Sequence, residues 1–306
     1  MEAERLPSAE NRKSLLSERI GQLAVLYAEQ MAEFGVPLEH SGDTLTSGWL
    51  CVIYFLGFLE HYPSAKLDEI FPRVSSYVAM YLLVDHFVDS PDVSKAQKIS
   101  LLQWLGSAGK DTIPAELEQI CEKLLFHLNI LGGDHIPELV RMVQESYKAQ
   151  VSPSLSTSAY LRECRRKGAL TSVLGTRIIF GELFTAEEHL ERLGYCAQLL
   201  DDITDCSSDL AAGVHTACTH RVRKDGNLDR IVWELLWELT LLPNELKKYA
   251  IGLRWMTVYV AGRTQYTSRG LRATLGLLPE KVAKICMRAK MESVLRIGYR
   301  NISCKS

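Results

Sequence analysis

The chain has 306 residues, of which 47% are hydrophobic and 24% are charged, a composition typical of a globular protein. Its 35 Lys and Arg residues nearly balance its 37 Asp and Glu residues, for a net charge of −2. This balance provides no broad basic field to bind nucleic acid, so we expect no nucleic-acid partner, and any anion site has to be local.

The N-terminal segment and the cysteines favour a cytoplasmic location. Residues 1–12 are polar and charged, without the apolar stretch of a signal peptide. We expect them to form a flexible arm before a single domain over residues 13–306. The longest uncharged run, residues 44–59, is too short to be a good membrane span. The eight cysteines include no C-x-x-C pair, which favours reduced thiols. We therefore expect no integral membrane segment.

Apolar residues recur at helical spacing along most of the chain. In chain order, the predicted helices cover residues 14–34, 44–60, 70–89, 95–104, 114–131, 137–151, 158–180, 186–210, 228–242, 244–270 and 279–297. Pro91 is a stop signal after the third helix, and Thr157 or Ser158 is expected to cap the seventh. Residues 213–226 are predicted to be a polar turn region. Because no segment alternates like a strand and the loops are short, we predict an all-α, single-domain antiparallel bundle.

An acidic pair lies in the apolar segment YLLVDHFVD, residues 81–89. Asp85 and Asp89 are four residues apart, so they share one face of the predicted helix. Like charges at this spacing destabilise a helix by roughly 0.2–0.5 kcal/mol, and ionised carboxylates are rarely buried without a partner. A bound cation would remove both penalties, so we interpret the pair as candidate metal ligands.

A second acidic cluster lies in the segment QLLDDITDCSSD, residues 198–209. Asp201, Asp205 and Asp209 recur every four residues on one stripe, and Asp202 lies beside them. Carboxylates suit Mg²⁺, which takes one or two of them together with waters and phosphate oxygens. One such motif alone is usually a solvated helix face. Two motifs flanked by Leu, Val and Ile favour a metal site instead, because unpaired buried charge is costly.

Both motifs resemble those of one enzyme superfamily. AQLLDDITD resembles the second aspartate-rich motif of trans-prenyltransferases, Q-x-x-D-D-x-x-D, and YLLVDHFVD resembles the first, with His86 in place of an aspartate. The spacing of Asp201, Asp205 and Asp209 also resembles the N-D-x-x-S-x-x-x-E metal motif of class I terpene synthases. The chain is thus similar to the class I isoprenoid synthase superfamily, in motif order and helical context, over most of its length.

This resemblance implies a helical bundle in which two acidic helices face each other across a deep apolar pocket. Three Mg²⁺ ions, or Mn²⁺ in their place, would join the carboxylates to the diphosphate of an allylic prenyl substrate. The residue match assigns two ions to Asp85 and Asp89 and the third to Asp201, Asp205 or both, with Asp202 and Asp209 nearby. The metal would neutralise the leaving diphosphate so that the allylic C–O bond can break. The resemblance also raises the hypothesis of a homodimer.

A diphosphate site needs positive side chains as well as metal ions. Lys167-Gly168 resembles the Lys-Thr pair that family members carry on the helix before the second metal motif. A second basic group follows the second acidic cluster, where a loop could close over bound diphosphate and exclude water. The candidate diphosphate-binding residues are Arg166, Lys167, Arg221, Arg223 and Lys224.

The sequence lacks the basic segments with which chain-elongating relatives bind their second substrate, and this absence bears on which reaction we expect. Chain-elongating relatives bind isopentenyl diphosphate with basic residues around the first motif, but residues 39–65 contain no Lys or Arg and no Arg pair follows Asp89. The leading hypothesis is a terpene synthase or cyclase that releases pyrophosphate, with aromatic side chains stabilising carbocations. One alternative is a divergent farnesyl or geranylgeranyl diphosphate synthase, and another is a non-catalytic prenyl-diphosphate-binding subunit. The aromatic candidates are Tyr54, Phe55, Phe58, Tyr77, Tyr81, Trp255 and Tyr259.

Overall fold

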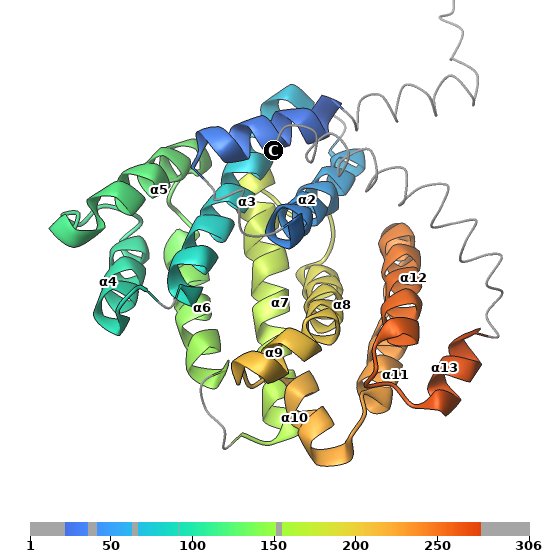
Figure 1. Cartoon of the computed structure of the whole chain (residues 1–306). Helices are drawn as coiled ribbons and strands as arrows, with labels where there is room; N and C mark the ends of the chain where they lie inside the picture. The colour runs from blue at the N-terminus through green and yellow to red at the C-terminus, as the bar shows by residue number, and fades with distance from the viewer. Residues whose placement is uncertain (1–21, 36–41, 63–66, 91, 151–154, 277–306) are drawn as a thin grey trace, which may run out of the picture. The chain divides into compact units, whose positions relative to one another are not determined.

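The structure is a computed structural model of the chain, and it describes residues 22–35, 42–62, 67–90, 92–150 and 155–276 (Figure 1). Every regular element within these ranges is a helix, which confirms the prediction of an all-α protein. The expected N-terminal arm and the predicted helix at 279–297 lie outside the described residues. No helix in the described part is long and apolar enough to cross a membrane.

The contacts between residues divide the chain into two compact units. Unit 1 contains the described helices before residue 95 together with residues 119–130, and unit 2 contains residues 95–118 and the described residues from 131 onward. Each unit buries apolar side chains of its own. The single domain expected over residues 13–306 therefore remains a prediction.

Unit 1 is built around two long helices that pack against each other, α2 and α3. Its elements are a helix at residues 22–33, α2 (Gly42–Gly57), η1 (Phe58–His61), α3 (Leu67–Asp89) and most of α5 (Glu118–Leu131). Three aromatic side chains are buried here, those of Phe55, Phe58 and Tyr77. The Phe55 ring meets the other two edge to face, with its centroid 5.9 Å from that of Phe58 and 5.3 Å from that of Tyr77. These aromatic side chains form a packed core in unit 1, so a carbocation-binding role for them remains a prediction.

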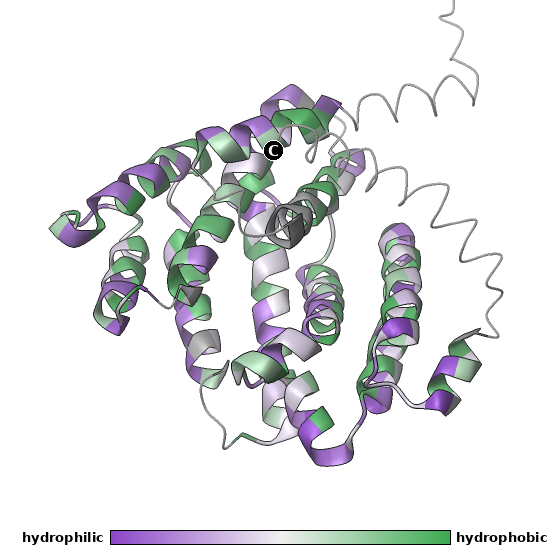
Figure 2. Cartoon of the chain, viewed as in Figure 1, coloured by the Kyte–Doolittle hydropathy of each residue, from purple (hydrophilic) through white to green (hydrophobic). Residues whose placement is uncertain are grey.

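Unit 2 is organised around the pair of helices α7 and α8, which lie side by side (Figure 1). Helix α7 also packs against α6 and α10, and α8 packs against α11 and α12. Figure 2 shows apolar and polar residues mixed along these helices, as expected for amphipathic helices that each bury one face. Its elements are α4 (Lys95–Gly106), η2 (Ala115–Leu117), α6 (Ile136–Gln150), α7 (Thr157–Phe180), α8 (Glu187–Thr204), α9 (Cys206–Ala212), α10 (Ala217–Asp225), α11 (Asp229–Glu238), η3 (Asn244–Leu246), α12 (Lys247–Arg263) and α13 (Arg269–Gly276).

Two glycines let the backbones of α7 and α8 approach closely. A Cβ atom added to Gly168 would overlap the carbonyl oxygen of Gly194, and a Cβ atom added to Gly194 would overlap the carbonyl oxygen of Gly168. Any side chain at either position would therefore push the helices apart. Gly168 directly follows Lys167, and Gly194 lies about two turns before Asp201. The contact thus draws the basic residue of α7 towards the acidic end of α8.

Three local predictions are corrected by the structure. Ser156 rather than Thr157 or Ser158 is the N-cap of α7, because its hydroxyl accepts a hydrogen bond from the Ala159 N–H at 3.3 Å. The predicted helix at 186–210 is interrupted at Asp205, which ends α8 and precedes α9. The expected turn region at 213–226 contains a helix, α10, started by a capping box between Thr216 and Thr219.

Candidate functional site

The second acidic cluster extends over the junction of α8 and α9. Asp201 and Asp202 lie in the last turn of α8, Asp205 lies between the helices, and Asp209 lies in the first turn of α9. The Asp205 N–H donates to the Asp201 carbonyl and the Asp209 N–H donates to the Asp205 carbonyl, both at 2.9 Å. The four-residue spacing therefore persists through the junction, although α9 runs in a different direction from α8 (Figure 1).

The carboxyl groups of this cluster are held in surroundings that oppose their ionisation. Desolvation raises the pKa of Asp202 to about 6. The pKa of Asp209 rises to about 7, first through desolvation and then through repulsion from Asp202, Asp205 and Asp201. Asp201 is exposed, whereas Asp202 and Asp209 are partly buried. Crowded carboxyl groups with raised pKa values form a site at which a cation would relieve both repulsion and desolvation.

Helix α7 provides the positive charge that faces the cluster. The Lys167 ammonium lowers the pKa values of Asp201, Asp202 and Asp209, opposing the desolvation that raises them. From α8 itself, the Gln198 amide donates hydrogen bonds to Asp201 Oδ2 at 3.2 Å and to Asp202 Oδ1 at 2.9 Å. The predicted residue Lys167 is thus brought to the predicted carboxylates, which the sequence separates by more than thirty positions.

Thiol groups complete the surroundings of Asp202. The buried Cys164 thiol, one turn before Lys167 on α7, hydrogen-bonds to Asp202. Burial raises the pKa of Cys164. Burial and nearby carboxylates raise the pKa of Cys206 to about 12, and they raise the pKa of Cys218 well above its ordinary value. These thiols therefore stay protonated at neutral pH and act as weak hydrogen-bond donors. The cysteines within the described residues are all free of disulfides.

Sequence reasoning did not list Cys164 or Gln198 among the site residues. A signal for Gln198 was present, because it precedes Asp201 and Asp202 by three and four residues and so shares their helix face. Cys164 precedes Lys167 by three residues, so it shares a face of α7 with it. Its contact with Asp202 depends on the close approach of α7 and α8, which spacing along one helix does not reveal.

Two of the other candidate diphosphate-binding residues already form ion pairs within the protein. Arg166 pairs with Glu163 at 2.9 Å and also with Glu145, and Arg221 pairs with Asp225 at 2.8 Å. Both charges are therefore already neutralised within the protein.

Arg223 lies near the cluster, because its charge lowers the pKa of Cys206, and its guanidinium contacts His215 Nδ1 at 2.7 Å. Lys224 is exposed in the last turn of α10. Because Arg221, Arg223 and Lys224 all lie on this capped helix, the expectation of a closing loop at these three residues is wrong.

The first acidic pair lies at the C-terminal end of α3. Asp85 is exposed there, as is its neighbour His86, and Asp89 is the last residue of the helix. Helix α3 belongs to unit 1, whereas the second cluster belongs to unit 2. The opposition of the two clusters, and the deep apolar pocket between them, remain predictions.

The side chains of the second cluster are carboxylates, the ligand type that Mg²⁺ takes in proteins. In the part of the chain that the structure describes, no group of three or more His, Cys, Asp and Glu side chains is arranged to hold a metal ion. Mg²⁺ instead commonly binds one or two carboxylates and takes its other ligands from water and phosphate. The carboxylates that could contribute are Asp201, Asp202, Asp205 and Asp209 in unit 2, and Asp85 and Asp89 in unit 1.

Comparison with known proteins adds no further constraint on this site. The chain matches no family model, no curated protein and no solved structure.

Proposed function

We propose that the protein is a Mg²⁺-dependent enzyme that binds and ionises an allylic isoprenoid diphosphate, acting as a terpene synthase or cyclase that releases pyrophosphate. The observation that carries the proposal is the group of mutually repelling carboxyl groups at Asp201, Asp202 and Asp209 beside Lys167. A divalent cation shared with a diphosphate matches this combination of negative and positive side chains.

Each side chain of the cluster has a role in this proposal. Asp201, Asp205 and Asp209 would hold Mg²⁺, which would neutralise the leaving diphosphate when bound. Lys167 would exchange its attraction to the carboxylates for attraction to diphosphate oxygens, which requires no large movement because it already faces the site. Gln198 and Cys164 fix the Asp202 carboxyl group through hydrogen bonds, so that it is oriented before any ligand arrives.

The first acidic pair completes the proposed clamp. Asp85 and Asp89 would hold the other metal ions, and Asp85 is an exposed residue near the end of α3. The absence of Lys and Arg from residues 39–65 supports the use of one diphosphate substrate rather than two. The cytoplasmic location and the homodimer are further parts of the hypothesis.

The proposal is tested by incubating the full-length protein with Mg²⁺ and geranyl, farnesyl or geranylgeranyl diphosphate, each with and without isopentenyl diphosphate. Pyrophosphate together with a hydrocarbon or alcohol from one allylic substrate is the expected result. A longer diphosphate that forms only with isopentenyl diphosphate would show an elongating synthase instead. Binding without any product would show a prenyl-diphosphate-binding subunit, and neither binding nor product would reject the isoprenoid assignment.

A further inference from the structure

The nearly neutral net charge conceals a strong asymmetry along the chain. From Lys247 to the end, the sequence contains 13 Lys and Arg residues but only 2 Asp and Glu residues, whereas the preceding part contains 22 and 35. Helix α12, which begins at Lys247, packs against α11. Within the described residues 247–276, which start next to α11, there are 6 Lys and Arg residues and no Asp or Glu.

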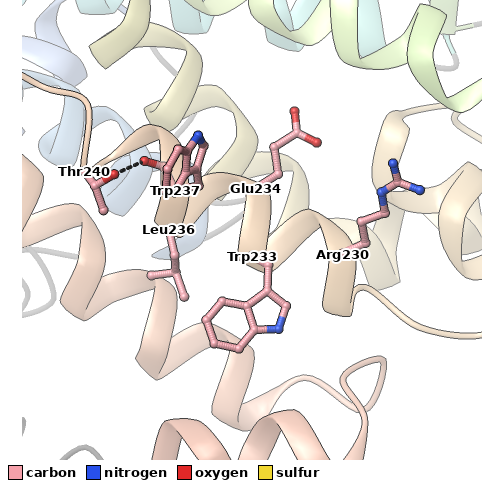
Figure 3. Close-up of a pocket in the computed structure, with 6 residues that line it drawn as sticks. All are labelled: Arg230, Trp233, Glu234, Leu236, Trp237 and Thr240. Carbon is pink, nitrogen blue, oxygen red and sulfur yellow. Dashed lines mark hydrogen bonds between the residues drawn. The ribbon is translucent and has the colours of Figure 1, made fainter.

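Helix α11 presents an apolar face to solvent. Trp233 and Trp237 are four residues apart on this helix, and their exposed fractions are 49% and 64%; Leu241, which is 46% exposed, lies just beyond the end of the helix. Figure 3 shows Arg230, Trp233 and Trp237 following one another along this helix. A groove of about 550 Å³ is formed along it, lined by Arg230, Trp233, Glu234, Leu236, Trp237 and Thr240. We refer to this surface as the tryptophan face.

The acidic residues of α11 are occupied by bonds within the protein. Asp229 accepts a hydrogen bond from the Ser268 N–H at 2.9 Å, and Glu234 accepts one from the Tyr195 hydroxyl at 2.6 Å. Glu238 forms ion pairs with Arg165 at 2.6 Å and Arg192 at 2.8 Å, and only 12% of its side chain is exposed.

Several basic residues of α11, α12 and α13 are exposed to solvent. Arg230 is exposed within the tryptophan face. Lys247 and Arg263 are exposed on α12, and Arg269 is exposed at the start of α13. Arg230 and these α12 and α13 side chains are therefore exposed positive charges, whereas Glu234, the acidic residue that lines the groove, is only partly exposed.

We propose that the tryptophan face is a docking surface for an anionic lipid bilayer. Tryptophan suits the membrane interface because its ring is largely apolar while its N–H can remain hydrated. Exposed basic residues nearby would be attracted to acidic lipid headgroups. Because no described helix can span a membrane, this binding would be peripheral.

A bilayer explains the surface better than a second copy of the chain. Two copies meeting through this face would bring like charges at Arg230 and α12 together, which opposes association. An anionic bilayer would attract the exposed basic residues, and its interface would accept the indole rings of Trp233 and Trp237. This inference does not depend on the proposed diphosphate chemistry.

The test is flotation of the full-length protein with vesicles of phosphatidylcholine alone or with about 30% phosphatidylserine. We expect flotation with the anionic vesicles only, and weaker flotation as salt rises from about 0.1 to 0.5 M. Exchanging Trp233 and Trp237 for alanine should weaken binding by about tenfold or more, and Arg230→Glu should weaken it by about fivefold or more. Ile99→Ala combined with Phe126→Ala removes similarly exposed apolar groups elsewhere and should leave binding unchanged.

Circular dichroism of each variant would establish that it is folded, and brominated lipids should quench the tryptophan fluorescence of the unmodified protein. Failure of the protein to float with anionic vesicles would overturn the proposal. So would equal flotation of the double tryptophan variant. Loss of a dimer in that variant, without vesicle binding by the unmodified protein, would assign the face to self-association instead.

Discussion

The two acidic motifs have similar spacing but different surroundings. Asp85 lies exposed on one continuous helix, α3, in unit 1. The carboxyl groups of the second cluster lie across the junction of α8 and α9, where desolvation and mutual repulsion raise the pKa values of Asp202 and Asp209. Their partners Lys167 and Cys164 come from another helix. Four-residue spacing can therefore align carboxylates on one helix face. How strongly they repel one another, and which side chains of other helices lie next to them, depends on tertiary packing.

Neutralising one carboxylate in each motif tests whether both acidic motifs are needed for activity, and it has the largest expected effect. Under the proposed function, Asp202→Asn should reduce the rate of pyrophosphate release about 10³-fold and Asp85→Asn about 10²-fold, because each removes preorganised electrostatic stabilisation. The rates would be measured with a coupled pyrophosphate assay, and circular dichroism would confirm retained helicity. Asp92→Asn, at an exposed residue beyond α3, is the control and should have no effect. Full activity in either motif variant would contradict the metal assignment.

The packing that distinguishes the second cluster can be disrupted at its glycine contact. Gly168→Ala should lower the free energy of unfolding by about 1–3 kcal/mol, because the added methyl group overlaps the Gly194 carbonyl and separates α7 from α8. Gly252→Ala is the matched control within α12, where an added Cβ meets no atom within 4 Å. It should stabilise the protein by about 0.5–1 kcal/mol. Urea unfolding measures both, and equal effects would show that the close approach is not required.

A smaller effect is expected from the hydrogen bonds around Asp202. Gln198→Ala removes the donor shared by Asp201 and Asp202, and it should weaken Mg²⁺-dependent activity by about 10- to 100-fold, as is typical for partners of metal ligands. The activity would be measured as a function of Mg²⁺ concentration. Gln103→Ala, at an exposed position on α4, provides the control. An unchanged Mg²⁺ dependence would indicate that these hydrogen bonds do not orient the carboxylates.

The smallest effect is a dependence of metal-free stability on pH. The pKa of Asp209 is about 7 in the folded protein against an ordinary value of 3.8, so between these values the native state binds more protons than the unfolded state. Its contribution to the free energy of unfolding therefore decreases as pH rises from about 4 to 7. In EDTA, the melting temperature of the unmodified protein should fall more steeply over this range than that of Asp209→Asn. Parallel curves for the two proteins would refute the raised pKa.

Much of the fold could be predicted from the sequence because helix periodicity and stop signals are local. The uncharged run at residues 44–59 became α2 and η1, and the helix stop signalled by Pro91 agrees with the end of α3 at Asp89. The capping pair at Thr216 and Thr219 was missed because polar residues near Gly213 also suit a turn. The interruption at Asp205 was missed because the apolar pattern continues through it to Leu210.

The candidate site was predictable in its residues but not in their environment. The motif spacing identified Asp201, Asp202, Asp205 and Asp209, and the resemblance drew attention to Lys167. No pattern along the chain could show that Arg166 is paired with two glutamates, because Glu145 lies on a different helix. The same limit applies to the raised pKa values, which arise from helices packed around the carboxyl groups.

The proposed function requires that the second cluster bind Mg²⁺ together with a diphosphate. Isothermal titration of inorganic pyrophosphate into the full-length protein, with Mg²⁺ or with EDTA, tests it most directly, with Asp202→Asn as the comparison. We expect binding only with Mg²⁺, proton release as the carboxyl groups of Asp202 and Asp209 give up protons, and at least about tenfold weaker binding in the variant. Binding that is equally strong in EDTA, or unchanged in the variant, would show that the second cluster is not a site for Mg²⁺ and diphosphate.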